Sequence, residues 1–530
     1  MNARFLLPLT LLCAACLSGS LSIDVHVLTQ SCRADRSPLT NVSKLRFTLT
    51  GDGIPAPIIE DNIDLTSGNL TMSSIPAGTG RRLRVEALNG PSPEGVVVAR
   101  GDSGRFDVTG TSGIAVTVFV RPIDAFSPTN RADAPTQCST MTMPRAGHTM
   151  TTMSDGRVLI TGGFTTIDGI TKNYLQSAEI YDPRSGSFTP AAMPHSARAF
   201  AAAAPLTRFT SPNMVFVSGG EFKGDSAVSP LRPAETYDGS NDAWSPQILP
   251  MKTARSHHTA TEDNTGRVLI AGGIQSAEGP APSMVSPLEF YDPAQAVVKP
   301  SATLLSSPRA NHAAVTLQIG AVLLIGGSDE HNNALDTMEG FVFVGNDYTQ
   351  SRGFSTVATP NFKLGTPHAR PAAALLASGT RVIVAGGFAG TFNTDARYDH
   401  VTDTTEIVDT VSDRVFAAPS LAVPRAEACA AALDDGGALI IGGATRQNGT
   451  LVSFDSADLY NSDASGSGVF SVHAVVGPMK DARNLFSCAK LPDGSVLVAG
   501  GIKYGATSTG TPTVTTLDTA EIYMPVGVAH

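Results

Sequence analysis

Seven pairs of adjacent glycines recur along this chain at nearly constant intervals. Successive pairs are 53 to 60 residues apart, counted between their first glycines. A fixed period of this length is the signature of a repeat architecture, in which each unit is one supersecondary element stacked on its neighbours. The pairs begin at Gly162, Gly219, Gly272, Gly326, Gly386, Gly442 and Gly500.

Each glycine pair closes a short apolar run, such as residues 158–161 or 382–385. Runs of four β-branched or leucine residues bounded by turn residues are typical of strands buried on both faces. Asp-Gly turns lie just upstream, as at residues 155–156 and 493–494. Asp-Gly between apolar runs is a strong hairpin signal. The pattern therefore predicts two antiparallel strands ahead of each pair.

An arginine precedes each glycine pair by 16 to 21 residues, and an acidic residue follows each pair, usually opening another strand. Together these features predict a four-stranded antiparallel unit. The arginines are Arg145, Arg198, Arg255, Arg309, Arg370, Arg425 and Arg483. The acids are Glu179, Glu235, Glu289, Glu339, Glu406, Asp458 and Glu521.

The recurring arginine, glycine pair and acid resemble the kelch motif, and the resemblance covers roughly residues 137–530. Kelch repeats build β-propellers with one four-stranded blade per repeat. The resemblance implies a seven-bladed propeller with the fold of the galactose oxidase central domain. The family often ends its third strand with a tryptophan, and here only Trp244 stands in such a place, with Phe188 at the equivalent position of blade one.

In each blade the arginine, the glycines and the acid are expected to share one edge. Strands one and three flank strand two and lie about 10 Å apart. We expect each arginine to cross over the glycine pair, which has no side chains, and to form an ion pair with the acid of its own blade. A feature present in all seven units serves the blade, so function is expected where the blades differ.

The repeat is out of phase with the chain ends, because the last unit stops after residues 521–523 without a fourth strand. We expect residues 136–143 to supply the missing outer strand, which would close the ring and remove a sheet edge.

Residues 22–125 contain short alternating strands with turn signals between them, which predicts a small β-sandwich. Residues 75–85 resemble the Ig-like or transthyretin-like modules of exported bacterial proteins. Residues 126–136, with Pro, Ser and Asn, are expected to be a linker before a propeller at 137–530. The tripeptide Arg100-Gly101-Asp102 matches a cell-adhesion motif but is expected to form a β-turn.

Residues 1–16 combine a positive residue, an apolar run and small residues, the pattern of a secretory signal peptide. Ala14-Ala15-Cys16 resembles the lipobox of bacterial lipoproteins, which implies lipidation of Cys16 and an anchor in the outer membrane or at the cell surface. Cleavage without lipidation, giving a periplasmic or secreted protein, is the alternative. No other stretch is apolar and long enough to span a bilayer.

Four further cysteines remain. Because export permits disulfides, Cys429 and Cys488 of adjacent units are expected to pair between blades, and Cys32 with Cys138 to tie the amino-terminal region to the propeller. Four free thiols are the alternative. The net charge is −10 with no basic run, which argues against nucleic acid as a partner. A monomer is expected.

Binding is expected in the loops after the glycine pairs, because loops carry function on a rigid scaffold and these vary most in length. The mixed aromatic and polar groups there suit a peptide or glycan; ordinary solvated loops are the alternative. The candidates are Phe222, Lys223, Phe388, Phe392, Asp395, Arg397, Tyr398, His400, Lys503 and Tyr504.

The expected function is a non-catalytic binding protein at the bacterial cell envelope that engages a protein or glycan, with no cofactor. The alternative is a secreted enzyme, either a copper oxidase similar to galactose oxidase or a sugar-modifying enzyme. Such oxidases carry an adjacent Tyr-His ligand pair, and the nearest approach here is residues 398–400. His148, His258 and His312 each lie three residues after their arginine and are expected to be packed, not to bind a metal.

Overall fold

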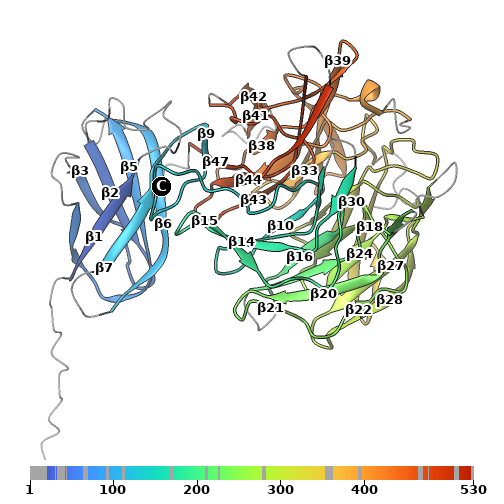
Figure 1. Ribbon diagram of the computed structural model, residues 1–530, viewed down its shortest axis with the longest axis horizontal. Helices are drawn as coiled ribbons and strands as arrows, with labels where there is room; N and C mark the ends of the chain where they lie inside the picture. Colours follow the sequence, from blue (N-terminus) through green and yellow to red (C-terminus); the bar gives the residue numbers. More distant parts are fainter. Residues whose placement is uncertain are drawn as a thin grey trace, which may run out of the picture.

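The computed structural model describes residues 21–526, apart from residues 30–31, 33–41, 43, 64–69, 91–94, 110–113, 167–170, 209–212, 225–226, 277–281, 352–361, 392–396, 463–469, 476 and 507–511. Figure 1 shows a small sheet body beside a large disc of radiating sheets. The fold is all-β, as predicted; the described residues contain one helical segment, the 3₁₀ turn η3 (Arg397–His400). None of their helices is long and apolar enough to cross a membrane.

The small body is a sandwich of two sheets. One sheet has the order β4 (Thr71–Ile75), β1 (Leu21–Leu28) and β7 (Ile114–Phe119). The other has the order β3 (Ile58–Ile63), β2 (Lys44–Thr50), β5 (Gly78–Asn89), β6 (Val96–Val108) and β8 (Arg121–Pro122). Alternate residues point into the core, as Leu45, Phe47 and Leu49 do from β2, so one face of each sheet is left for other contacts.

Over the described residues, the disc contains seven antiparallel sheets, six of four strands and one, blade two, with a short fifth strand. Blades one to three are β10 (Thr149–Thr152), β11 (Val158–Thr161), β14 (Ala178–Asp182), β15 (Ser187–Ala191); β16 (Ala202–Leu206), β17 (Met214–Ser218), β20 (Pro233–Asp238), β21 (Ala243–Trp244) with β22 (Leu249–Pro250); and β23 (Thr259–Glu262), β24 (Val268–Ala271), β27 (Pro287–Asp292), β28 (Val297–Leu304). Blades four to six are β29 (Ala313–Thr316), β30 (Val322–Ile325), β31 (Met338–Val344), β32 (Asp347–Gln350); β33 (Ala372–Leu375), β34 (Arg381–Ala385), β35 (Thr405–Asp409), β36 (Arg414–Ala418); and β37 (Cys429–Ala432), β38 (Ala438–Ile441), β41 (Ala457–Ser462), β42 (Phe470–Ala474). Blade seven is β43 (Ser487–Lys490), β44 (Val496–Ala499), β47 (Ala520–Met524) and β9 (Ala125–Pro128).

The first strand of each blade lies innermost. Each inner strand neighbours that of the next blade, and β43 of blade seven neighbours β10 of blade one, so the sheets close into a ring. Apolar clusters fill the spaces between adjacent blades, for example Leu439 and Ile441 of blade six against Val496 and Val498 of blade seven. Because both faces of each blade are covered, the second strands are mostly apolar, as the four-residue runs predicted, with a polar or charged residue only at an end, such as Ser218 or Arg381.

The repeat arginine crosses the glycine pair in six blades. In blade four, Arg309 Nη2 lies 2.8 Å from Glu339 Oε1, and its Nη1 donates to the carbonyls of Gly326 at 2.9 Å and Thr337 at 2.8 Å. Both charged side chains are fully buried. Glu339 also accepts the N–H groups of residues 306–307. The other pairs are Arg145–Glu179, Arg198–Glu235, Arg255–Glu289, Arg425–Asp458 and Arg483–Glu521.

Blade five departs from this arrangement, and the prediction that Arg370 pairs with Glu406 is wrong. His368 occupies the arginine's place: its Nδ1 donates to the carbonyl of Gly386 at 2.6 Å, and its Nε2 lies 3.7 Å from Glu406 Oε2. The spacing along the chain could not distinguish the two residues. Most repeat arginines precede the glycine pair by 17 residues, and His368 (18 residues) and Arg370 (16 residues) differ from this by one residue each. Arg370 pairs with Glu427 instead.

The glycine pairs also join neighbouring blades. In blade one the φ angles are +68° at Gly162 and +91° at Gly163, a region that favours glycine. A Cβ atom on Gly162 would lie 2.5 Å from the carbonyl oxygen of Arg198 in blade two. Gly163 N–H donates to that same oxygen at 2.7 Å. The pairs therefore serve close backbone contact between blades as well as the passage of the arginine.

The ring is closed by a segment other than the predicted one. The outer strand of blade seven is β9, which pairs antiparallel with β47, and not residues 136–143. Residues 125–128 thus belong to the propeller and not to a linker. The segment at Cys138 still lies beside the carboxy-terminal strand, because Thr129 N–H donates to the carbonyl of Ala520 at 3.1 Å and Asn130 forms an isolated bridge with Cys138.

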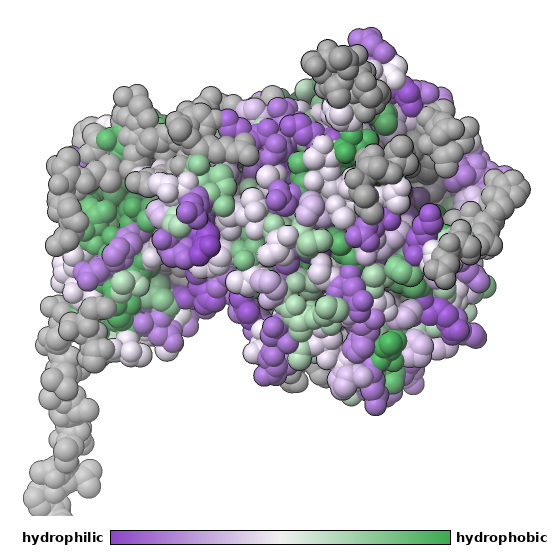
Figure 2. Space-filling model, in the orientation of Figure 1, coloured by the Kyte–Doolittle hydropathy of each residue, from purple (hydrophilic) through white to green (hydrophobic). Residues whose placement is uncertain are grey.

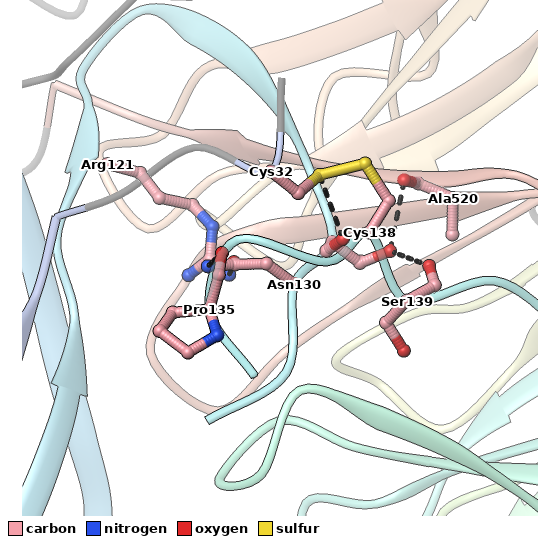
Figure 3. The surroundings of a disulfide bond; sticks show 8 residues. Cys32, Arg121, Asn130, Pro135, Cys138, Ser139 and Ala520 are labelled. Atoms are coloured by element: carbon pink, nitrogen blue, oxygen red, sulfur yellow. Dashed lines mark hydrogen bonds between the residues drawn. A yellow bond between two sulfur atoms is a disulfide. The ribbon is translucent and has the colours of Figure 1, made fainter. Parts of the chain in front are cut away.

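Both expected disulfides are present. Cys32–Cys138, with Cα atoms 4.9 Å apart, links the chain after β1 to the propeller; Figure 3 shows it beside Ser139 and Ala520. Cys429–Cys488, with Cα atoms 6.1 Å apart, links the inner strands of blades six and seven. Cys16 lies outside the described residues, so its lipidation stays a prediction.

Candidate ligand-binding site at the channel mouth

A ring of residues with left-handed backbone surrounds the propeller axis. Each lies two residues after the repeat arginine, or after His368 in blade five, and their φ angles fall between +50° and +60°. Backbone hydrogen bonds join five neighbouring pairs, such as Phe200 N–H to Gly147 O at 2.8 Å. The seven are Gly147, Phe200, His257, Asn311, Arg370, Glu427 and Leu485. Non-glycine residues in this region are uncommon and cluster at functional sites.

Two hollows meet at this ring. One, of about 250 Å³, lies among the inner strands and includes His148, His258 and His312 in its lining. The other, of about 330 Å³, opens towards the hairpins β12 (Phe164–Thr166)–β13 (Lys172–Tyr174) and β45 (Ile502–Ala506)–β46 (Pro512–Thr516). We call this second hollow the channel mouth. Phe200, His257, Arg370 and Leu485 line both hollows.

The side of the channel mouth formed by blades four to six carries a charged network. Arg370 Nη1 lies 2.5 Å from Glu427 Oε1, and its Nε donates to Asn311 Oδ1 at 2.9 Å. Glu427 Oε2 accepts hydrogen bonds from Tyr398 at 2.6 Å and from Asn484 at 2.9 Å. The Glu427 side chain is 1% exposed and Arg370 18%. The buried carboxylate therefore holds a guanidinium that faces the hollow.

The opposite side of the channel mouth is built around Phe200. The ring of His257 stacks on Phe200 with centroids 4.4 Å apart. Lys172 Nζ lies 4.8 Å from the Phe164 centroid and 4.9 Å from that of Phe200, contacts worth about 0.5–1 kcal/mol each when exposed. Glu221 accepts a hydrogen bond from Lys172 at 3.4 Å. A lysine and a carboxylate thus lie beside the aromatic rings on this side of the channel mouth.

Burial sets the protonation of groups near the axis. Burial, with a smaller effect of the Arg145 charge, lowers the pKa of His148 to about 3. Burial lowers the pKa of His312 to about 3 as well. Burial first, and then the Glu221 carboxylate, raises the pKa of Tyr174, which donates to Glu221 at 2.9 Å. These imidazoles are neutral at physiological pH, as expected for packed side chains.

Among the predicted loop residues whose side chains the structure describes, only two lie at this site. Tyr398 and Tyr504 lie edge to face, with ring centroids 6.2 Å and hydroxyl oxygens 3.4 Å apart, and Tyr504 lines the channel mouth. Phe388 was expected on the loop surface, but it is fully buried beneath Tyr398. An aromatic residue directly after the glycine pair packs inward, as Phe164 does in blade one.

Four other predicted loop residues, Phe222, Lys223, Lys503 and His400, are not part of the channel-mouth lining. Phe222 packs edge-on against Tyr174 at 5.8 Å and remains 39% exposed, and Lys223 is exposed beside it on β18 (Glu221–Lys223). Lys503 Nζ lies 3.7 Å from Asp481. His400 ends η3 and is exposed.

Phe392 and Asp395 lie outside the described residues. Arg397 opens η3.

Several residues of the site escaped the sequence analysis, notably Lys172, Phe200, Glu221, His257 and Glu427. The sequence held a signal for three of them. Phe200, His257 and Glu427 lie two places after the repeat arginine, at the ring position, which holds a different residue in each of the seven units. Inspecting that position across the repeat would have identified six of the seven ring residues, but not Arg370, which follows His368.

The copper oxidase alternative can be tested against the residues present. The described residues contain no group of three or more His, Cys, Asp or Glu side chains placed to hold a metal ion. Cys429 and Cys488 are joined to each other, and the Tyr398 hydroxyl donates to Glu427. These side chains do not fit the copper ligand set of a galactose oxidase-like enzyme.

No protein-family model matches this chain, and no curated protein matches it. Among solved structures, the chain is similar to a fungal alcohol oxidase of the AA5 family solved in complex with copper, with 16% identity, 72% of this chain and 74% of that chain covered, and a TM-score of 0.51. It is also similar to YjhT, with 15% identity, 63% and 99% covered, and a TM-score of 0.45. The fold is that of a β-propeller of the galactose oxidase type.

Proposed function

We propose that this chain is an exported, non-catalytic kelch propeller that binds a glycan at the channel mouth. The observation that carries the proposal is the ring position itself. One strained backbone position, repeated in seven blades, presents Phe200, His257, Arg370 and Leu485 to a hollow of about 330 Å³. At the same position, Asn311 and Glu427 hold the Arg370 guanidinium. A position kept for backbone geometry but varied in chemistry suits recognition better than blade stability.

A glycan fits the mixture of groups at the channel mouth. Sugar hydroxyls both donate and accept hydrogen bonds, and Arg370 and Lys172 supply donors while Glu221 supplies acceptors. Polar groups on a largely preformed, partly apolar hollow are typical of small-ligand sites. Bidentate donors such as the guanidinium add directionality to such contacts. A peptide partner, the other class expected from the loops, is an outcome of the test below.

The proposed location is the bacterial cell envelope, with Cys16 as a lipid anchor. Support comes from the signal-like first 16 residues and from the two disulfides, which persist in oxidising compartments. Labelling of the expressed protein with a radioactive fatty acid, with Cys16→Ser as control, tests the anchor.

The binding proposal is tested on a glycan array and a peptide array probed with purified protein. Lys172→Met and Arg370→Met should abolish a glycan signal. Lys223→Met is the matched control, because Lys223 is exposed on the same loop face but does not line the channel mouth. A signal lost with Lys223→Met and kept with Lys172→Met would move the site to the outer hairpins. A signal on peptides alone would replace the glycan with a protein partner.

The enzyme alternative is separated by metal analysis and by turnover. Stoichiometric copper in the purified protein, or conversion of any bound sugar, would replace the binding function with catalysis.

A further inference from the structure

A second hollow lies between the sandwich and the propeller. Its volume is about 300 Å³. Strands β5, β6 and β7 of the sandwich line one side, and the Asp-Gly turns of blades one and seven, residues 154–156 and 491–495, line the other. In Figure 2 hydrophilic residues gather along the junction of the two bodies. Domain interfaces are frequent locations of ligand sites.

Two arginines face each other in this hollow. Arg82 of β5 and Arg105 of β6 are directly paired in the antiparallel register, and both line the hollow. Like charges directly opposite on adjacent strands repel each other. Over the part of the chain that the structure describes, neither guanidinium has a carboxylate within ion-pair distance, unlike the neighbouring pair Arg84–Asp102, whose Nε and Oδ1 lie 3.4 Å apart. An anion placed between Arg82 and Arg105 would remove this repulsion.

Asp102 supplies a complementary group. It lines the same hollow, its side chain is 1% exposed, and its Oδ2 has no hydrogen-bond partner among the described residues. A buried carboxylate oxygen without a donor is costly, so a ligand that donates to it would be favoured. Burial raises the pKa of Asp102, in keeping with this unmet need for a donor.

The tripeptide Arg100-Gly101-Asp102, which matches a cell-adhesion motif, lies next to this hollow. It lies within strand β6 and not in the expected turn. Arg100 is 3% exposed, and its guanidinium contacts Val526 O at 3.5 Å and Met524 Sδ at 3.7 Å. A Cβ atom on Gly101 would lie 2.1 Å from the carbonyl oxygen of Phe119. Arg100 is therefore buried against the carboxy-terminal segment and Gly101 against β7, which leaves Asp102 as the residue of the three that lines the hollow.

The remaining walls favour an organic ligand over an inorganic ion. Phe119 of the sandwich and Leu491, Pro492 and Ile522 of the propeller give the hollow apolar surface. The two propeller carboxylates that line the hollow have partners of their own. Asp493 accepts hydrogen bonds from the backbone and hydroxyl of Ser495 within its own turn, and Asp155 pairs with Arg157.

We propose that this interdomain hollow binds a sugar acid, a hydroxylated carboxylate. Its carboxylate lies between Arg82 and Arg105, a hydroxyl donates to Asp102 Oδ2, and the C–H face of the sugar ring packs against Phe119 and Pro492. The site is separate from the channel mouth and does not depend on the function proposed there.

The test is isothermal titration of the full chain with three matched probes. Glucuronate carries both the carboxylate and the hydroxyls, glucose lacks the carboxylate, and cyclohexanecarboxylate lacks the hydroxyls. Glucuronate is expected to bind at one site, at least tenfold more tightly than either of the others. Absence of glucuronate binding overturns the proposal, and equal binding of cyclohexanecarboxylate overturns the assigned role of Asp102.

Variants locate the bound probe. Arg105→Gln should weaken glucuronate binding at least tenfold, and because Arg105 is exposed and unpaired among the described residues the variant should fold. Arg414→Gln is the matched control, an exposed arginine on the outer strand of blade five. Arg370→Met should leave the affinity unchanged. Loss with Arg370→Met and retention with Arg105→Gln would place glucuronate at the channel mouth and overturn the proposal.

Discussion

Blades four and five of the propeller solve the same structural problem differently. In blade four, Arg309 reaches across the glycine pair and ends on Glu339, with both charges fully buried. In blade five, the shorter His368 reaches the glycine carbonyl but stops 3.7 Å from Glu406. Glu406 Oε2 is left without a hydrogen-bond partner among the described residues. One blade is held by a complete ion pair and the other by a partial substitute.

The difference between blades four and five shows how one repeat can supply an arginine to a candidate binding site. The only arginine in this part of blade five is Arg370, two residues beyond the place where the repeat holds its arginine. From there its guanidinium meets Glu427 of blade six at the channel mouth. The arginine, glycine pair and acid that recur in the repeat stabilise the blades. The ring position, two residues after the arginine, holds a different residue in each blade. Function is therefore expected at that ring position.

The largest expected effect is the loss of unfolding free energy when the acid of blade four is replaced. The same substitution in blade five is the comparison. Glu339→Gln leaves the fully buried Arg309 without its charge partner, which should cost about 3–5 kcal/mol of unfolding free energy. Glu406→Gln should cost about 1 kcal/mol, because no arginine depends on it. Equilibrium denaturation in urea measures both. Equal losses would mean that blade five holds its acid as tightly as blade four does.

The junction between blades six and seven offers the next effect. Among the described blades it alone carries a disulfide, Cys429–Cys488, closing a loop with a sequence separation of 59 residues. Replacing both cysteines with alanine should lower stability by about 2–4 kcal/mol. Thermal unfolding with and without reductant is the measurement. With reductant the double variant should match the parent protein, because Cys32–Cys138 is then open in both. Without reductant, a variant as stable as the oxidised parent would show that the Cys429–Cys488 cross-link adds nothing.

The inner-strand histidines should make the propeller sensitive to acid. The pKa of His148 falls from 6.5 to about 3 in the folded protein through burial and the nearby charges of Arg145 and Arg483. The unfolded chain therefore binds the proton first, and stability is lost as the pH falls from about 6.5 towards 3. The slope is at most about 1.4 kcal/mol per pH unit for each such histidine.

His148→Phe sharpens the comparison between blades, because blade seven already has Phe486 at the equivalent position. The variant should unfold less steeply with acid over that pH range while remaining stable at neutral pH. Denaturation at pH 7 and pH 5 distinguishes the two proteins. An unchanged pH dependence would show that His148 is not the neutral, buried group described.

The fold of the propeller could be predicted from the sequence, but most residues of the candidate site could not, for physical reasons. Glycine pairs, arginines and acids recur because every blade needs the same backbone contacts and the same buried charge pair, so period and pairing could be predicted. His368 could not be recognised, since only the structure shows that it, and not Arg370, fills the repeat position. Phe388 was misplaced because an aromatic residue in a loop gives no sign of whether it packs inward.

The closing strand and the interdomain hollow depended on long-range contacts. Residues 125–128 have no strand signal stronger than that of residues 136–143, and only the position of β47 selects between them. Arg82 and Arg105 become a pair only through the register of β5 with β6. No local sequence pattern indicates which distant strands will pair in this way.

The most direct test of the account compares the unfolding free energies of Arg309→Met and Arg370→Met. Arg309→Met should lose about 3–5 kcal/mol, because it removes a fully buried guanidinium from Glu339 and from the carbonyls of Gly326 and Thr337, in a place closed to water. Arg370→Met should lose at most about 1.5 kcal/mol, because Arg370 is partly exposed to the hollow, where water can take the place of its guanidinium, and Glu427 keeps its hydrogen bonds from Tyr398 and Asn484. Equal losses, or a larger loss for Arg370→Met, would contradict the claim that blade five gave up its structural arginine to the channel mouth.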